Sequence, residues 1–191
     1  MFKAAFLLLP FLLCSAAPKG ELVVISGKTS DYEIVRADKA LPPAVTAADE
    51  LSKFLEKSTG VKLAIVTAPS AGKKHIFVGE NPQSDAAGVK ASDLKPEGFR
   101  IKTVGDDIHI VGADTRGKAE EVKRTVATQC GTLFGVYEFL ERYADAFFAG
   151  HDDLLTILPR KTEIKVPAVD LTQAPDWISR CMTDSPEGSV T

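Results

Sequence analysis

The segment from Gly131 to Tyr143 (GTLFGVYEFLERY) constrains the fold of this 191-residue chain more than any other. Its apolar side chains recur at the spacing of one helical face, while Glu138 and Arg142 lie four residues apart on the opposite face. The apolar stripe consists of Leu133, Val136, Phe139, Leu140 and Tyr143. We expect Thr132 to cap the first turn, because its hydroxyl can accept a free backbone N–H. The segment therefore predicts an amphipathic helix that packs on a sheet and carries no chemistry of its own.

The remaining pattern predicts an α/β (α+β) domain. Pro42 and Pro43 open a second helix, and Gly60 ends it. Short apolar or alternating runs predict strands at 21–25, 32–36, 62–66, 75–78, 98–104, 108–111, 154–158 and 163–166. The first two strands are predicted to form one hairpin, and 98–104 with 108–111 a second. Residues 81–96 are predicted to be a surface loop with at most one helical turn.

Residues 1–17 have the pattern of a signal peptide. Lys3 precedes an apolar run at 4–13, and small residues follow at 15–17. The run is too short to span a bilayer as a mature helix, so we expect a secreted or periplasmic protein with no membrane contact after cleavage. Cys130 and Cys181 remain in the mature chain. Export would permit a disulfide between them, but two unpaired thiols are the favoured interpretation.

Charge and short motifs exclude several classes of function. The net charge is −3 with no basic block, which argues against a nucleic-acid partner. Gly27-Lys28-Thr29 lacks the earlier glycine of a phosphate loop, since Leu22 stands there, and is predicted to be a turn. The three histidines (His75, His109 and His151) have no ligand spacing, and His109 is expected on the surface side of its strand. No metal and no cofactor is predicted.

No catalytic residue is predicted either. Adjacent acids occur at 49–50, 106–107, 120–121 and 152–153. A glycosidase needs two carboxylates that face each other across roughly 5–10 Å, and neighbours in sequence do not supply this. We interpret the pairs as solvating or helix-start charges, and substrate-binding residues stay unknown. Trp177 is expected to pack against a following domain, with stacking on a sugar ring as the alternative.

The order of segments resembles a known family. The segments are 47–66, 75–81, 97–117, 131–143 and 166–177, and together they span nearly the whole mature chain. This order resembles the N-terminal accessory domain of family 67 α-glucuronidases. It is also similar to the domain that precedes the barrel in family 20 β-hexosaminidases. The resemblance implies a mixed β-sheet with two main helices packed on one face, over residues 20–167, in an exported protein of polysaccharide (xylan-type) breakdown.

The sequence departs from that family in two places. Residues 118–129 look like an insertion, and 168–191 are predicted to be a linker or disordered tail where the catalytic barrel would begin. The family's catalytic carboxylates belong to the barrel, so none is carried onto this chain. The expected function is a non-catalytic accessory domain whose partner is a glycoside hydrolase barrel or a polysaccharide. The alternatives are a stand-alone secreted carbohydrate-binding or interaction module and, third, a small enzyme.

Overall fold

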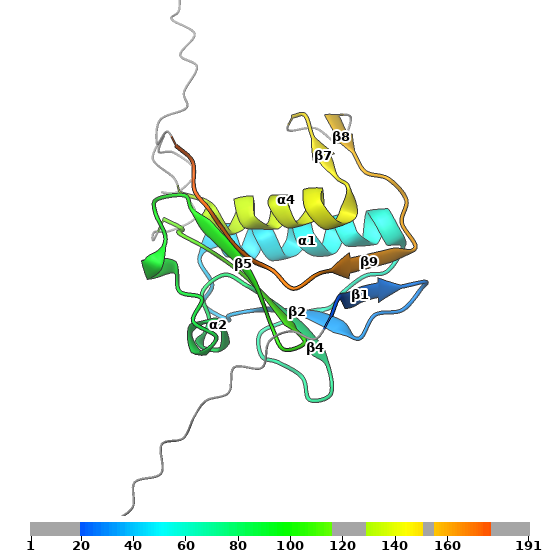
Figure 1. Cartoon of the computed structure of the whole chain (residues 1–191), viewed down its shortest axis with the longest axis horizontal. Helices are drawn as coiled ribbons and strands as arrows, with labels where there is room; N and C mark the ends of the chain where they lie inside the picture. Colours follow the sequence, from blue (N-terminus) through cyan, green and yellow to red (C-terminus); the bar gives the residue numbers. More distant parts are fainter. Residues whose placement is uncertain (1–19, 116–128, 151–154, 177–191) are drawn as a thin grey trace, which may run out of the picture.

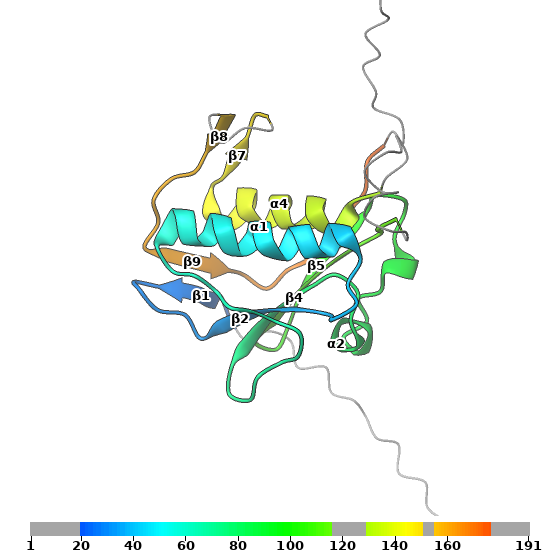
Figure 2. The same ribbon diagram turned by 180° about the vertical axis from the view of Figure 1, so that it is seen from behind.

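A computed structural model describes residues 20–115, 129–150 and 155–176. Within these ranges, a six-stranded mixed sheet carries two long helices on one face (Figures 1 and 2), which confirms the predicted fold class. The elements run in the order β1 (Leu22–Ser26), β2 (Tyr32–Arg36), α1 (Pro42–Thr59), β3 (Ile65–Val66), β4 (Lys74–Val78), α2 (Pro82–Ala86), η1 (Ala91–Asp93), β5 (Phe99–Val104), β6 (Asp107–Gly112), α4 (Gly131–Ala144), β7 (Phe147–Phe148), β8 (Thr156–Ile157), β9 (Glu163–Val166) and β10 (Asp170–Gln173).

The main sheet has the strand order β10-β5-β6-β4-β2-β3. Strands β6, β4, β2 and β3 are parallel to one another, and β5 pairs antiparallel with both β6 and β10. The predicted β5–β6 hairpin is confirmed. Gly105 turns the chain there with φ 61°, a left-handed conformation that favours glycine. Strand β3 is shorter than predicted and retains two residues.

Helices α1 and α4 lie side by side over the sheet (Figures 1 and 2). Both follow the sequence prediction closely. Pro42 and Pro43 begin α1, and Gly60 ends it at φ 78° with its N–H bonded to the carbonyl of Glu56. On α4, the ion pair of Glu138 and Arg142 lies on the face turned away from the core.

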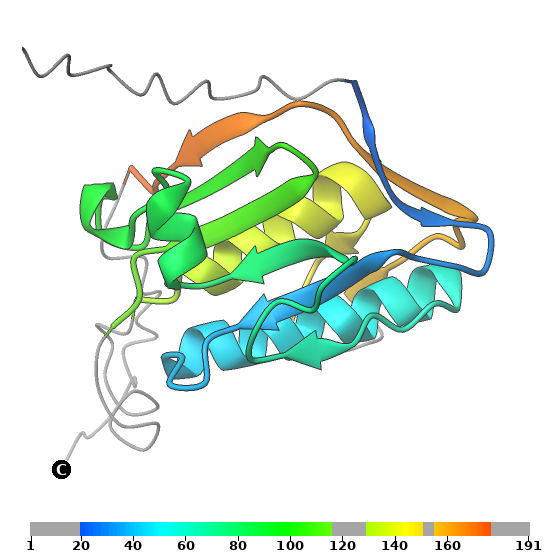
Figure 3. The same ribbon diagram turned by 90° about the horizontal axis from the view of Figure 1, so that it is seen from below.

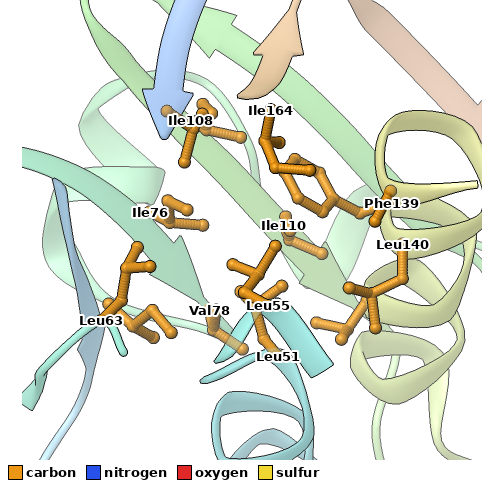
Figure 4. Packing of buried hydrophobic residues seen from close by; sticks show 14 of the residues in the cluster. Leu51, Leu55, Leu63, Ile76, Val78, Ile108, Ile110, Phe139, Leu140 and Ile164 are labelled. Carbon is orange, nitrogen blue, oxygen red and sulfur yellow. The ribbon is translucent and has the colours of Figure 1, made fainter. Parts of the chain in front are cut away.

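The core lies between these helices and the sheet (Figure 4). Leu51 and Leu55 of α1 and Phe139 and Leu140 of α4 are fully buried. They pack against branched side chains of the parallel strands, namely Ile76, Val78, Ile108 and Ile110. Removal of this apolar surface from water, worth about 25 cal/mol per Å², is the main force that holds the two layers together.

The predicted hairpin of β1 and β2 is wrong. Strand β1 pairs antiparallel with β9 in a separate two-stranded sheet, with Leu22 opposite Val166. The turn after β1 does form, with Gly27 at φ 60° and a bridge between Ser26 and Thr29. The chain then enters the main sheet as β2. Burial explains the partner, because Ile164 of β9 is fully buried in the same core as β1.

The predicted domain end at residue 167 is too early. Strand β10 continues the main sheet by pairing with β5, and Leu171 packs against the core. Arg100 holds this strand, since its Nε and Nη2 donate to the two carboxylate oxygens of Asp170 at 2.7 and 2.8 Å. The Arg100 guanidinium also lowers the pKa of Asp170. Strand β10 follows Pro167 and has a single apolar residue, Leu171. So short a segment has too little alternation of apolar and polar residues to be predicted as a strand of the domain.

Several predictions fall outside the described residues. They are the signal peptide at 1–17, nearly all of the insertion at 118–129, His151, Trp177, Cys181 and the rest of the tail from 177 to 191. Among the helices in the described ranges, none has both the length and the apolar character needed to cross a membrane.

Candidate functional site

A row of titratable side chains crosses the sheet face that lies away from α1 and α4. His75 Nδ1 lies 3.1 Å from Asp107 Oδ1, and His75 Nε2 lies 3.6 Å from Glu33 Oε1. Both carboxylates also accept backbone N–H groups, from His75 at 2.9 Å and from Ser70 at 2.6 Å. The row therefore ties β2, β4, β6 and the loop before β4 together. Its carboxylates are engaged in structural hydrogen bonds, which does not suit a general acid–base pair.

His109 is buried, so the predicted surface position is wrong. Its ring stacks on Phe77 with centroids 4.9 Å apart, and its Nδ1 lies 3.0 Å from Ser84 Oγ. The alternation along β6 correctly places His109 on the face opposite the long helices. That face is covered there by α2 (Figure 3), which the polar composition of residues 81–96 did not reveal. Burial lowers the pKa of His109 to about 4, with a smaller contribution from Lys102 and an opposing one from Asp107.

Ser84 and His109 are a serine–histidine pair, but their setting is structural. The Ser84 side chain is fully buried, and its backbone N–H donates to Asn81 Oδ1 at 2.8 Å as the cap of α2. A nucleophilic hydroxyl must be reachable by a substrate, and this one is not. The pair fastens α2 to the sheet.

The adjacent acids Asp106 and Asp107 have separate partners. Asp106 lies 3.6 Å from Lys74, whereas Asp107 bonds to His75. Glu50 of α1 pairs with Lys53 at 3.2 Å. The pairs at 120–121 and 152–153 lie outside the described residues. In the part of the chain that the structure describes, no three His, Cys, Asp or Glu side chains are grouped so that they could hold a metal ion.

The N-terminus of α4 is capped from a neighbouring strand. Asp114, just after β6, accepts the Thr132 N–H at 2.9 Å. The predicted cap by Thr132 itself is wrong, because its hydroxyl instead accepts the Gly112 N–H at 3.0 Å. Burial raises the pKa of Asp114 to about 6, the bonds to Thr132 lower it, and Glu80 raises it further. Cys130 is half-buried beside this cap, and burial raises the pKa of its thiol, which disfavours the reactive thiolate.

Asp114 and His109 give opposite pH dependences of stability. The pKa of folded Asp114 lies above its ordinary value of 3.8, so its stabilising effect is complete below that value and is lost as pH rises through about 6. The pKa of folded His109 lies below its ordinary value of 6.5, so its stabilising effect is complete above that value and is lost as pH falls to about 4. Each effect is worth about 3 kcal/mol at most, and the two oppose each other between about pH 4 and 6.

Single substitutions should separate these two effects. Asp114→Asn keeps an oxygen acceptor for Thr132, and the stability of this variant should fall by about 2 kcal/mol relative to that of the wild type between pH 7 and pH 4.5. His109→Gln should change relative stability in the opposite direction over the same interval. Urea unfolding at both pH values measures this. Stability differences from wild type that do not change with pH in either variant would contradict the assignment.

An apolar surface lies on the hairpin of β7 and β8. Phe147, Leu155 and Ile157 are 56%, 48% and 65% exposed, and we call them the hairpin surface. The hairpin extends past the helix layer on the side opposite the sheet (Figures 1 and 2). Phe148 anchors it, with its ring centroid 5.1 Å from that of Phe54 on α1 and 4.7 Å from that of Tyr137 on α4. The hairpin surface is therefore held in place by the core beneath it.

A groove lies at the other end of α4, beside the last residues of β10. We call it the β10 groove. It has a volume of about 520 Å³ and is lined by Glu97, Phe99, Phe134, Thr172, Gln173, Ala174 and Pro175. Phe134, in the first turn of α4, is 36% exposed. The groove thus combines an aromatic ring with a carboxylate, an amide and a hydroxyl.

Neither feature is predicted from the sequence. Residues 144–153 have neither helical nor strand spacing, and 168–176 belong to the stretch 168–191 for which the sequence predicts a linker or disordered tail. The one available signal was the pair of adjacent phenylalanines at 147 and 148 beside the apolar run 154–158. That pattern shows apolar content, but it does not show which side chains stay exposed.

Comparison with known proteins places the chain in a family. Residues 26–122, just over half of the chain, match the family described as glycosyl hydrolase family 67 N-terminus. No curated protein matches the chain.

Solved structures of several glycoside hydrolases are also similar. A family GH20 β-N-acetylhexosaminidase from Streptomyces coelicolor A3(2) is 15% identical with a TM-score of 0.46, over 81% of this chain and 25% of that one. A family GH115 4-O-methyl-α-glucuronidase with specificity for decorated arabinogalactans is 20% identical with a TM-score of 0.45, over 81% and 18%. This chain thus spans a quarter or less of the length of these structures. On the strength of the family match, the chain belongs to the N-terminal domains of glycosyl hydrolase family 67.

Proposed function

We propose that this chain provides the non-catalytic accessory domain of an exported, α-glucuronidase-like glycoside hydrolase that acts on xylan-type polysaccharide. Family membership supports the glycosidase context. The signal-peptide pattern at residues 1–17 supports export. In this function, the domain packs on a catalytic domain and stabilises or positions it, while the hydrolytic carboxylates belong to that partner.

The observation that carries the proposal is the hairpin surface. Three large apolar side chains stand exposed together on a hairpin that a partly buried aromatic residue, Phe148, fixes to the helix layer. Grouped apolar side chains of this kind mark interaction sites, because leaving them in water is unfavourable. A rigid, preformed apolar surface also binds with a smaller entropic cost than a mobile one. We therefore assign the hairpin surface to contact with the catalytic domain.

Binding to a family 67 catalytic domain, expressed without its own N-terminal domain, tests this proposal. Isothermal titration calorimetry should detect a complex. Ile157→Ser and Phe147→Ser should each weaken it at least about tenfold, since central apolar anchors carry most of the free energy of an interface. Both side chains are exposed, so the domain should stay folded.

Val23→Ser is the matched control. Val23 is also an exposed apolar residue, 42% accessible, but it lies on β1, on the sheet side of the helix layer (Figure 1). It should leave affinity unchanged. Absence of a complex at about 100 μM of each protein, or equal losses for Val23→Ser and Ile157→Ser, would contradict the assignment. Hydrolysis of aryl glucuronides by the isolated, repurified domain would contradict the non-catalytic role.

A further inference from the structure

We propose that α2 is an acid-opened flap over a small apolar cluster on the sheet face that lies away from α1 and α4. Within the described ranges, four buried apolar residues on this side of the sheet lie outside the main core, and we call them the second cluster: Val35 on β2, Phe77 on β4, Val111 on β6 and Val89 just after α2. The three strand residues alternate with main-core residues such as Ile34, Ile76 and Ile110, so they point to the opposite face. The ring of His109 lies there as well, stacked on Phe77.

Helix α2 lies against this face (Figure 3) and is five residues long. Its Ser84 is fully buried, and Ser84 Oγ lies 3.0 Å from His109 Nδ1. Just after the helix, the backbone carbonyl oxygens at 87 and 88 accept hydrogen bonds from Lys102 Nζ and Arg100 Nη1, both at 3.1 Å. A single helical turn is not stable by itself, so α2 depends on these contacts and can detach while the two-layer core stays folded.

Protonation of His109 works against this attachment. A charged imidazole beneath α2 is deprived of water, and this burial lowers the pKa of His109 to about 4. When α2 detaches, water reaches the ring and its pKa returns toward the ordinary value of 6.5. The open form therefore binds the proton more strongly, and acid shifts the equilibrium toward it. Opening uncovers the ring of Phe77, which is 3% exposed beneath the flap.

The charged groups on the surrounding elements do not offset this burial. Asp107, on the same strand as His109, raises the pKa of His109, and Lys102, directly opposite on β5, lowers it. Both effects are smaller than that of burial. On α2, the ionisable residue is Asp85, which is exposed. Within the described residues, the ring bonds to the neutral Ser84 hydroxyl, so no bonded carboxylate compensates a charge on His109.

Native-state amide hydrogen exchange, followed by NMR, tests the flap. The measured quantity is the protection factor, which corrects for the intrinsic effect of pH on exchange. Protection of the Ser84 and Val89 N–H groups, which bond within the flap, should fall about a hundredfold between pH 7 and pH 4. Protection of the Gly79 N–H, bonded to the Ile110 carbonyl within the sheet, should change far less, because global unfolding also carries the opposite pH dependence of Asp114.

Three variants assign the effect to one side chain. His109→Gln stays neutral and should abolish the fall in α2 protection. Ser84→Ala keeps His109 and the backbone N–H that is capped by Asn81, so it should lower α2 protection at every pH and retain the fall. His75→Gln is the matched control, because His75 lies on the same face, with its ring centroid 5.4 Å from that of Phe77, and bonds to Asp107 instead of Ser84. It should retain the fall.

The flap is refuted if α2 and Gly79 lose protection equally between pH 7 and pH 4, if His109→Gln retains the fall, or if His75→Gln removes it. If His109→Gln does not fold, the wild-type comparison of α2 with Gly79 still decides. None of these measurements involves a catalytic domain, so the flap and the docking proposal stand or fail separately.

Discussion

Gly112→Ala should abolish folding or cost more than about 4 kcal/mol, the largest effect that we expect from a single added methyl group in this domain. Gly112 is the last residue of β6, where the strand passes directly beneath the start of α4. A Cβ there would overlap the backbone nitrogen of Thr132 and the carbonyl carbon of Gly131, and would lie 2.6 Å from the Cα of Gly131. All three atoms belong to backbone, so no side chain can move aside to relieve the overlap.

Two other glycines make this a graded series. At Gly135, a Cβ would lie 2.9 Å from Cγ2 of Ile110 and 3.2 Å from Cβ of Phe99, so Gly135→Ala should cost about 1–3 kcal/mol as these side chains adjust. At Gly105, a Cβ would meet nothing within 4 Å, and only the positive φ of 61° is strained. Gly105→Ala should therefore cost about 1 kcal/mol.

Urea denaturation of the three variants, together with their soluble yield, measures the series. Destabilisation should be smallest for Gly105→Ala, larger for Gly135→Ala and largest for Gly112→Ala. A folded Gly112→Ala protein with a transition midpoint close to that of Gly105→Ala would show that the strand and helix do not approach each other in this way. The contact matters for the sites as well, because it fixes the start of α4 and with it Phe134.

Elements that depend on interactions within a few residues are predicted well from the sequence, whereas pairings between distant segments are not. Helices α1 and α4 and the hairpin of β5 and β6 were predicted well, because helical spacing, Gly60 and the glycine turn at 105 act within a few residues. Strand β1 was assigned correctly but given the wrong partner. Its true partner β9 is about 140 residues away, and a local pattern holds no information on such a pairing.

The wrong predictions at the candidate sites also come from interactions between segments that are far apart in the sequence. Alternation along β6 predicted correctly which face His109 occupies, but not that α2 covers that face. The cap of α4 comes from Asp114, eighteen residues before Thr132, and no helix-start rule considers so distant a residue. Exposure of Phe147 and Ile157, and the position of Glu97 and Gln173 in the lining of one groove, are properties of the assembled fold. They could not be read from segments taken one at a time.

Leu140→Ala should destabilise the domain by about 2–5 kcal/mol. Leu140 is fully buried in the core beneath α4, where it lies among side chains of α1 and the central strands (Figure 4). Truncation removes apolar contacts and leaves a cavity that the tightly packed surroundings fill only in part. Alanine suits a helix at least as well as leucine does, so the loss should come from packing and not from helix propensity.

Glu138→Ala on the same helix is the control. Its side chain lies on the outer face in an ion pair with Arg142, four residues along, and such pairs contribute about 0.3–0.5 kcal/mol. The two variants change neighbouring positions of one helix to the same residue, so their difference isolates burial. Urea midpoints should fall strongly for Leu140→Ala and hardly at all for Glu138→Ala. Equal midpoints would mean that α4 does not present this face to the sheet, and the positions assigned to Phe134 and the hairpin surface would then have to be reconsidered together.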